Sequence, residues 1–292
     1  MCRHAYLIMV HNEMYLLKQL LETLDSAKND IYIHLDKKCK NVDLNDLKTH
    51  VKKSQVYFVK RMNVTWGGDS MVKCEYRLLK EAFARHYQHY HLLSGVDFPL
   101  KSQEYIHNFF EKHREISYIH VAKRDQHHFD TLRTRNKEYH FLQNLIGRYD
   151  NTSNVIYRLE RKLIRFQRKL GINRLEKCPI KMYKGSQWFS ITHDMVREIL
   201  EKEKIVKKYF MKSYCPDELF INTVIMNSKN NHMVVNDYLR LIDWDRGRPY
   251  VFELKDYDEL ICSNKLFARK FTCETEDGKE LISKLKNYVM QE

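Results

Sequence analysis

The stretch AYLIMVHNEMYLLKQLLETL, residues 5–24, decides the fold of this chain. Its first part, Ala5–Val10, is a short apolar run that ends at the polar residue His11, which is typical of a buried strand. Its second part repeats leucine at helical spacing, so a helix should follow the strand directly. The repeating leucines are Leu16, Leu17, Leu20, Leu21 and Leu24. A buried strand that leads into an amphipathic helix begins a βαβ unit.

The same alternation continues through the rest of the chain. Further strands are predicted at Ile31–Leu35, Gln55–Val59, His89–Leu93, Gln187–Ile191 and Leu239–Asp243. Helices are predicted at residues 70–86, Asp194–Lys204, Pro216–Met226, Asp256–Asn264 and residues 276–290. This alternation predicts an α/β fold with a mixed, mostly parallel central sheet flanked by helices. Since 43% of the 292 residues are hydrophobic and no Pro- or Gly-rich linker occurs, we expect a single domain.

Charge and cysteine content narrow the class of protein. A net charge of +13 favours an anionic partner, which composition leaves open as nucleic acid, a phosphate-bearing small molecule or an acidic membrane surface. The seven scattered cysteines contain no Cys-x-x-Cys pair, which argues against a zinc site or a disulfide framework and favours reduced thiols. P-loop, Gly-x-Gly-x-x-Gly, Gly-x-Ser-x-Gly and His-Glu-x-x-His motifs are missing, which excludes the common NTPase, dinucleotide, hydrolase and zinc-protease classes.

Polar residues follow three of the predicted strands: His11, Asp36 and the segment Ser94–Asp97. Ligands of open α/β sheets bind at the carboxyl ends of strands, so these are candidate binding residues, although each could equally be a turn residue that caps a helix. Trp66 and Trp188 each lie near glycine, which permits close backbone approach while an indole packs on a sugar or a base. Either tryptophan could equally belong to the core.

Tyr214-Cys215-Pro216-Asp217-Glu218 lies at a predicted helix start. Proline fits the first helical turn and acids favour the positive end of the helix dipole, so local structure alone would explain the pattern. The functional interpretation rests on the same physics, because a glutamate held ionised there can accept a proton from an acceptor hydroxyl. Spacing alone favours the structural interpretation.

Two kinds of motif bear on phosphate or metal binding. Asp243-Trp244-Asp245 and Asp256-Tyr257-Asp258 match the Asp-x-Asp metal motif of many nucleotide-sugar transferases. Asp243 follows a strand too late in the chain, and Asp256 and Asp258 open a predicted helix, so we interpret both as non-metal matches. Leu266–Phe271 places two cations between aromatic residues. This is either an exposed basic turn or a clamp for the diphosphate of a sugar nucleotide. Arg246 and Arg248 lie upstream and could supply a second cation.

Residues 157–171, YRLERKLIRFQRKLG, predict a basic amphipathic helix. Leu159, Leu163, Phe166 and Leu170 form its apolar stripe. The favoured interpretation is a surface helix whose stripe faces the core. The sharper hypothesis is a helix that docks on anionic lipid, where each cation adds about 1 kcal/mol.

Eight segments, taken in order, resemble the core-2/I-branching N-acetylglucosaminyltransferases of glycosyltransferase family 14 and the related peptide O-xylosyltransferases. They are AYLIMVHNE (5–13), IHLDKK (33–38), WGGDSMV (66–72), HLLSGVDFPLKS (91–102), KGSQWFSIT (184–192), YCPDELF (214–220), LRLIDW (239–244) and LFARKF (266–271). The resemblance implies a GT-A-like fold and an inverting, metal-independent transfer. It divides the chain into a nucleotide-binding half (1–105), an acceptor and catalytic half (106–275) and a C-terminal helix (276–292).

The resemblance also implies roles for individual residues. Glu218 matches the catalytic base. Lys270 matches the lysine that neutralises the diphosphate. The family's arginine partner of this lysine lies on a loop that is shorter here, so two residues are candidates for it: Arg248 first and Arg246 second. The predicted nucleotide-binding residues are Val10, His11, Asp36, Trp66 and Asp97. The predicted acceptor-binding residues are Trp244, Trp188, Arg135 and Tyr139.

The expected function is transfer of GlcNAc from a UDP-sugar to a glycan or lipid-linked acceptor in bacterial surface polysaccharide synthesis, with no metal or other cofactor. UDP-xylose is the alternative donor. A nucleic-acid or anionic-membrane binding protein is the alternative from another class, although no nucleic-acid motif supports it. The sequence contains no transmembrane run and no secretory signal, so the expected location is the cytoplasm, with peripheral contact to the inner face of the membrane through residues 157–171.

Overall fold

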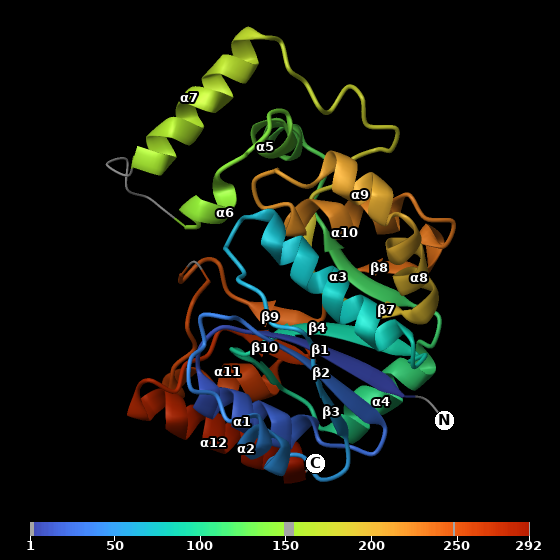
Figure 1. Ribbon diagram of the computed structural model, residues 1–292. Helices are drawn as coiled ribbons and strands as arrows, with labels where there is room; N and C mark the ends of the chain where they lie inside the picture. The colour runs from blue at the N-terminus through green and yellow to red at the C-terminus, as the bar shows by residue number, and fades with distance from the viewer. Residues whose placement is uncertain (1–2, 149–154, 248, 292) are drawn as a thin grey trace.

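The computed structural model describes residues 3–148, 155–247 and 249–291. Its centre is a seven-stranded sheet in the order β3-β2-β1-β4-β7-β6-β8 (Figure 1). β7 runs antiparallel to both its neighbours, while the other strands share one direction. The strands are β1 (His4–Val10), β2 (Asn29–Leu35), β3 (Gln55–Phe58), β4 (His89–Ser94), β6 (Ser117–Val121), β7 (Gly185–Thr192) and β8 (Val234–Asn236). The predicted α/β fold with a mixed, mostly parallel sheet is confirmed.

The segment that decides the fold forms β1 and α1 (Met14–Leu24) as predicted. All seven residues of β1 are buried, because β2 and β4 flank it and both its faces are covered. All five predicted leucines of α1 are also buried. Between the two elements Glu13 adopts a left-handed backbone with a φ of 57°, which turns the chain from the strand into the helix.

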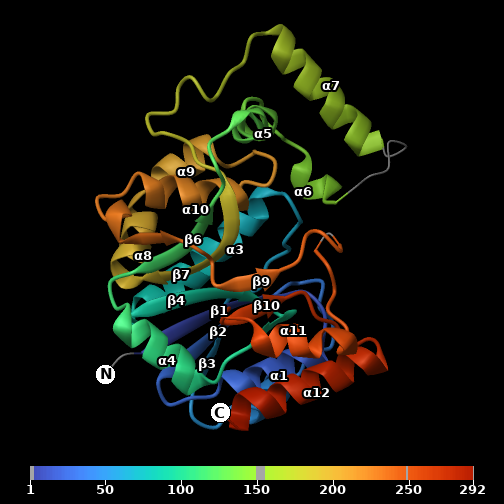
Figure 2. The same cartoon turned by 180° about the vertical axis from the view of Figure 1, so that it is seen from behind.

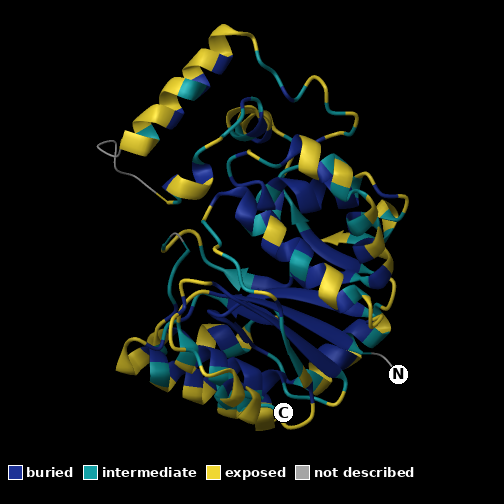
Figure 3. Ribbon diagram, in the orientation of Figure 1, coloured by how far each residue is buried: buried dark blue, intermediate teal, exposed yellow. Residues whose placement is uncertain are grey.

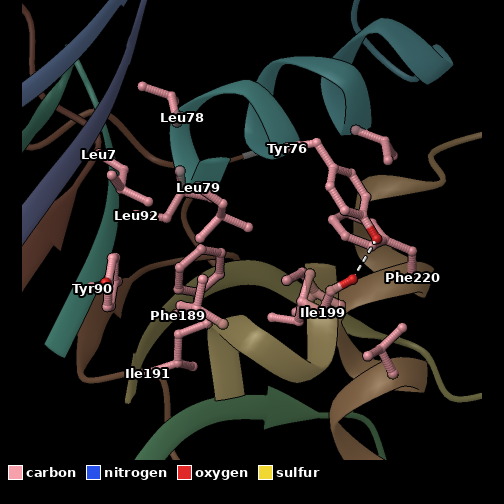
Figure 4. Packing of buried hydrophobic residues seen from close by; sticks show 14 of the residues in the cluster. Leu7, Tyr76, Leu78, Leu79, Tyr90, Leu92, Phe189, Ile191, Ile199 and Phe220 are labelled. Carbon is pink, nitrogen blue, oxygen red and sulfur yellow. Dashed lines mark hydrogen bonds between the residues drawn. The ribbon is translucent and has the colours of Figure 1, made fainter. Parts of the chain in front are cut away.

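Helices cover both faces of the sheet, and each face has its own apolar core (Figures 1 and 2). One face carries α3 (Asp69–Phe83), α8 (His193–Glu201), α9 (Glu203–Tyr209) and α10 (Asp217–Met226). Figure 4 shows this core, where Tyr76 donates a hydrogen bond of 3.0 Å from Oη to the carbonyl of Ile199. The other face carries α1, α2 (Leu44–Thr49), α4 (Gln103–Lys112), α11 (Tyr257–Cys262) and α12 (Glu276–Gln291). Two 3-10 turns, Asn231–Met233 and Leu254–Asp256, complete the connections.

A second sheet of three short strands lies against the end of the first. Its order is β5 (Asp97–Pro99), β10 (Phe267–Arg269) and β9 (Arg240–Ile242). The buried guanidinium of Arg240 joins the two sheets by donating to the carbonyls of Leu92 (3.0 Å) and Phe189 (2.8 Å). Burial lowers the pKa of Arg240 to about 10, so this side chain remains charged at neutral pH.

The chain between β6 and β7 forms a lobe of three helices, which stands away from the sheet in Figures 1 and 2. They are α5 (Gln126–Asn136), α6 (Gln143–Ile146) and α7 (Val155–Lys169). α7 is the predicted basic amphipathic helix, but the core-facing orientation of its stripe is wrong. Of the predicted stripe, Leu159, Phe166 and Leu170 are exposed and Leu163 is half-buried, while Glu160, Ile164 and Gln167 are buried. Figure 3 shows most of α7 as exposed. The stripe faces solvent because the segment that packs against the inner face of α7, residues 138–142, offers polar backbone groups.

Candidate functional site

A cavity of about 240 Å³ opens at the carboxyl ends of β1, β2 and β4. Five residues predicted from the sequence line it together: Val10, His11, Asp36, Trp66 and Trp188. Val10, His11 and Asp36 reach it because parallel neighbouring strands end at one edge of a sheet. Trp188 was predicted for the acceptor, yet it shares this cavity with the residues predicted for the nucleotide. We call this space the strand-end cavity. Its lining comes from both predicted halves of the chain, residues 1–105 and 106–275.

A larger hollow of about 570 Å³ lies at the opposite edge of the sheet, lined by Arg3, Gln88 and Thr192 among others. Arg3 and Gln88 precede β1 and β4, so this hollow lies at the amino ends of parallel strands. Binding sites of open α/β sheets lie at the carboxyl ends, which favours the smaller strand-end cavity as the functional site.

Asp36 shapes the rim of the strand-end cavity. Its buried carboxylate accepts hydrogen bonds from the backbone of Lys38 (2.8 Å) and Val64 (2.9 Å). The Nζ of Lys38 donates a hydrogen bond of 2.7 Å to the carbonyl of Val64. These bonds hold the loop that leads to Trp66 across the end of β2.

Arg269 lines the strand-end cavity, and the small sheet explains why. The register of β10 against β5 places Arg269 opposite Asp97, and the guanidinium donates to that carboxylate at 2.7 Å. The guanidinium also lies 4.6 Å from the ring centroid of Trp188 and contacts the hydroxyl of Ser94. Asp97 itself is fully buried and accepts from the backbone of Ser94 at 2.9 Å. The structure thus places Asp97 behind Arg269, outside the lining of the cavity.

Lys270 follows Arg269, and its segment is anchored to the end of β1. Glu13 accepts hydrogen bonds from the hydroxyl of Thr272 and from the backbone of Cys273 (3.0 Å). Partial burial, followed by the charges of Arg269 and Lys270, lowers the pKa of His11. The field of both cations therefore reaches the cavity. Lys270 makes no ion pair with any residue that the structure describes.

The upstream arginines have different outcomes. Arg248 lies outside the described residues. Arg246 forms ion pairs with Asp243, with Asp256 (2.8 Å) and with Glu259 (2.7 Å). Its guanidinium is therefore engaged by three carboxylates and closes the loop that carries Trp244, which is 60% exposed. Arg269 was not among the predicted site residues, although the two adjacent cations in residues 266–271 indicated a diphosphate clamp.

Glu218 lies in the first turn of α10, after Pro216. Its carboxylate is half-buried and forms an ion pair with Arg135 of α5. Lys184 lies close enough to feel both charges, and its pKa is lowered by burial and then by Arg135. Glu218 thus stands at the positive end of the helix dipole, beside the cations Arg135 and Lys184.

Several contacts hold the start of α10 next to the strand-end cavity. The rings of Trp66 and Tyr214 meet edge to face at 5.8 Å, and the backbone of Cys215 donates to the carbonyl of Gly67 at 2.8 Å. Gly67 has a φ of 69°, a conformation that favours glycine. On the other side, Asn222 donates from Nδ2 to the carbonyl of Ser186, just before Gln187 and Trp188 in β7.

Two further buried acids lie near Glu218: Asp217, which belongs to the motif at the start of α10, and Glu75, which no sequence signal marked. Asp217 is fully buried, and desolvation, with the charge of Glu218, raises its pKa to about 7. Glu75 of α3 is also fully buried, and desolvation followed by the charge of Asp217 raises its pKa well above the usual value. Neither carboxyl oxygen of Glu75 has a hydrogen-bond partner among the described residues.

A third cavity, of about 380 Å³, lies between α5, α6 and α7. It is lined by Arg135, Tyr214, Tyr157 and Arg161 among others, so it adjoins the ion pair of Glu218. Tyr139 does not line it. Its ring packs against Phe141 (5.4 Å between centroids) and receives the guanidinium of Arg174 at 4.3 Å. We call this space the lobe cavity.

Residues 3–148, 155–247 and 249–291 contain neither a clustered metal site nor a membrane-spanning helix. Within these ranges, histidine, cysteine, aspartate and glutamate do not gather in groups of three or more that could hold a metal ion. Within the same ranges, every helix is too short or too polar to cross a bilayer.

One family model matches most of this chain. The model of a family described as Core-2/I-Branching enzyme matches residues 4–265. Xylosyltransferase 2 of Rattus norvegicus is 24% identical over 92% of this chain, and the beta-glucuronosyltransferase GlcAT14B of Arabidopsis thaliana is 26% identical over 92%. The matched region spans 32% of the rat protein and 63% of the plant protein. A crystal structure of mouse xyloside xylosyltransferase 1 aligns over 94% of this chain and 99% of its own, with a TM-score of 0.41 and 12% identity.

Proposed function

Since the chain belongs to the Core-2/I-branching enzyme family, we propose that it transfers a sugar from a UDP-sugar to an acceptor hydroxyl, inverting the anomeric carbon and needing no divalent metal. One observation carries the proposal. Glu218 lies in the first turn of α10, whose start contacts Trp66 and Gly67 at the strand-end cavity, and the lining of that cavity includes the cation Arg269, with Lys270 next in the chain. A base and a pair of cations are what the two ends of such a displacement need.

The proposed chemistry begins with the nucleotide in the strand-end cavity, against Val10, His11, Asp36 and Trp66. The acceptor hydroxyl gives its proton to the carboxylate of Glu218 while its oxygen bonds to the anomeric carbon. The bond from that carbon to the diphosphate breaks on the opposite face, so configuration inverts and UDP leaves with the electron pair.

Arg269 and Lys270 take up the charge that develops on the departing diphosphate. Arg presents a bidentate fork and Lys a point charge, which suits two adjacent phosphates. Asp97 is proposed to act through Arg269, as a positioning residue. Arg248 keeps its place as a proposed further cation.

The acceptor is proposed to enter from the side of the lobe. Arg135 connects the lobe cavity to Glu218, so it can orient the carboxylate and the acceptor together. Trp244 offers an exposed ring on a loop whose Tyr250 accepts from the backbone of Lys270 at 3.3 Å. That position suits a ring that packs on an acceptor sugar next to the reacting centre.

GlcNAc is the proposed donor sugar and a bacterial surface glycan, free or lipid-linked, the proposed acceptor. The names of the relatives supply a specific reason to test two other donors. These names describe xylosyl and glucuronosyl transfer, so UDP-xylose and UDP-glucuronate should be tested as donors together with UDP-GlcNAc.

The test is binding and hydrolysis of a panel of UDP-sugars by the full chain, with and without excess EDTA. We expect selective turnover of one donor that EDTA leaves unchanged. Activity that EDTA abolishes and manganese restores would refute the metal-independent mechanism. Binding of nucleic acid that tightens at low salt, with no response to any UDP-sugar, would favour the other class of protein.

Glu218→Gln tests the base. It keeps the shape of the side chain, so we expect retained fold and UDP binding with a loss of turnover of about 10²–10⁴. Glu201→Gln, at the exposed end of α8, is the matched control. Full activity in Glu218→Gln would remove Glu218 from the mechanism.

A further inference from the structure

α7 presents its apolar side chains to solvent. Val155 is 69% exposed, Leu159 48%, Phe166 59%, and Leu170, just past the helix, 61%. Ordinary surface helices turn such a stripe inward, against the core. In Figure 3 the outer surface of α7 is exposed along most of its length, and Figure 1 shows it as the helix farthest from the sheet.

The side chains of α7 divide into three sectors around its axis. At about 100° per residue, Val155, Phe166, Leu159 and Leu170 fall within an arc of about 60°. The buried residues Glu160, Ile164 and Gln167 fall in the next arc. On the other side of the stripe, an arc of about 100° holds five cations. They are Arg158, Arg161, Lys162, Arg165 and Lys169.

Specific hydrogen bonds fix this orientation. Gln167 accepts from the backbone of Tyr139 at 2.8 Å and donates to its carbonyl at 2.9 Å. Glu160 accepts from the backbone of Leu142 at 3.1 Å, and Arg168 pairs with Glu138 at 2.9 Å. The polar face of α7 is thus matched to the chain at residues 138–142. Turning the leucines inward would break these bonds and bury unpaired backbone groups.

Charge identifies the occupant of the outer face. The five cations beside the stripe make no ion pair with another residue that the structure describes. Glu160 is the single acid in the sequence of α7, and it points inward. An apolar stripe bordered by cations without acids is complementary to a surface with anionic headgroups above an apolar interior.

We propose that α7 docks this protein on anionic lipid bilayers, with the exposed stripe in the headgroup boundary and the neighbouring cations on lipid phosphates. The lobe cavity is lined by Tyr157 and Arg161 of α7 and by Arg135, the partner of Glu218. Docking therefore holds the acceptor side of the site next to the bilayer. This last step rests on the proposed function and assigns the acceptor to the lipid-linked class.

Co-sedimentation of the full chain with vesicles tests the docking. We expect binding to phosphatidylcholine vesicles that contain phosphatidylglycerol and little binding to phosphatidylcholine alone. Leu159→Glu with Phe166→Glu should weaken binding by about tenfold or more. Arg158→Glu, Lys162→Glu and Arg165→Glu together should weaken it by about 100-fold or more. Two control variants carry the same kinds of change elsewhere on the surface. They are Leu44→Glu with Met290→Glu, and Lys52→Glu with Lys53→Glu and Lys60→Glu. Each should weaken vesicle binding only as much as its change in net charge predicts, to within about twofold.

Three results would overturn the proposal: no binding of the wild-type chain to anionic vesicles, equal binding to both vesicle types, or equal losses in the α7 variants and their controls. Hydrolysis of the UDP-sugar in solution, measured on the same variants, should be unchanged. If wild-type protein bound the vesicles but turned over no UDP-sugar, the proposed function would fail while the docking stood.

Discussion

α1 and α7 are both amphipathic helices, yet they turn their apolar side chains in opposite directions. α1 follows a fully buried strand, and its leucines pack between the sheet and α12. α7 follows no strand and meets the polar backbone at residues 138–142, so Val155, Leu159 and Phe166 face solvent. The contrast shows that periodicity predicts a helix and a stripe, whereas the neighbour decides which way the stripe points. It also separates a sheet that carries the stability of the protein from a lobe whose surface is free for contacts.

Acid should destabilise the sheet more than any other change considered for this protein. Four buried histidines cluster where β1 and β4 meet α4: His4, His89, His91 and His107. Burial lowers the pKa of all four, to about 4 for His89 and His107. The unfolded chain therefore binds protons first as the pH falls below 6.5, so stability is lost between about pH 6.5 and pH 4. Each of these two histidines contributes about 3 kcal/mol to that loss. Urea unfolding at pH 7.5 and 4.5 measures it, and equal midpoints would contradict a neutral cluster.

Leu20→Ala tests the inward stripe of α1. The side chain is fully buried against the sheet, so we expect the free energy of unfolding to fall by about 2–5 kcal/mol. Denaturant unfolding followed by circular dichroism measures the change. A loss below about 1 kcal/mol would mean that α1 contributes no more stability than an exposed helix.

Arg269→Ala tests the edge where the two sheets meet. Loss of a charge that stabilises the leaving diphosphate should lower kcat by about 10²–10³. Asp97→Asn should lower it less, because the arginine remains but loses its ionised partner. Arg197→Ala, on the exposed side of α8, is the control. Wild-type kcat in Arg269→Ala would move the diphosphate to other cations.

Glu75→Gln should stabilise the protein at neutral pH. Burial raises the pKa of Glu75, so the folded state holds it neutral while the unfolded chain ionises above about pH 4.5. This costs stability as the pH rises, and the glutamine removes that cost at pH 7.5. The gain should vanish below pH 4. Glu81→Gln, exposed on the same helix, is the control, and a gain that persisted at pH 4 would contradict the explanation.

Leu159→Ala should have the smallest effect and completes the comparison with Leu20→Ala. The side chain is exposed on the outer face of α7, so the free energy of unfolding should change by no more than about 0.5 kcal/mol. Thermal melting of both variants under one set of conditions gives the contrast. A destabilisation close to that of Leu20→Ala would show that the stripe of α7 is packed in the folded protein.

The sequence analysis predicted the elements whose periodicity is long or whose burial is complete. β1, α1, β2 and α3 appear within a few residues of their predicted bounds. β5, β6, β8 and β10 were missed. Three of them have only three residues, which gives a weak periodic pattern, although β9 of the same length was predicted within the run Leu239–Asp243. The helix predicted at Asp194–Lys204 is divided between α8 and α9.

The site divides in the same way. Glu218 and Lys270 follow from motifs, and the strand-end residues follow from the topology of the sheet. Arg269 depends on the register between β10 and β5, which joins residues far apart in the chain. The orientation of α7 depends on hydrogen bonds to residues 138–142, and Glu75 depends on burial alone. Contacts of this kind leave no local pattern to read.

The tie between Glu13 and Thr272 has a consequence for the order in which the protein is made. The two residues are 259 positions apart, so β1 leaves the ribosome long before the segment that carries Arg269 and Lys270. The half of the cavity formed by β1 and β2 can exist on a nascent chain, but its positively charged wall cannot. Capture of the donor would therefore be among the last properties the growing polypeptide acquires, and a premature stop before residue 266 would yield a sheet without a working pocket.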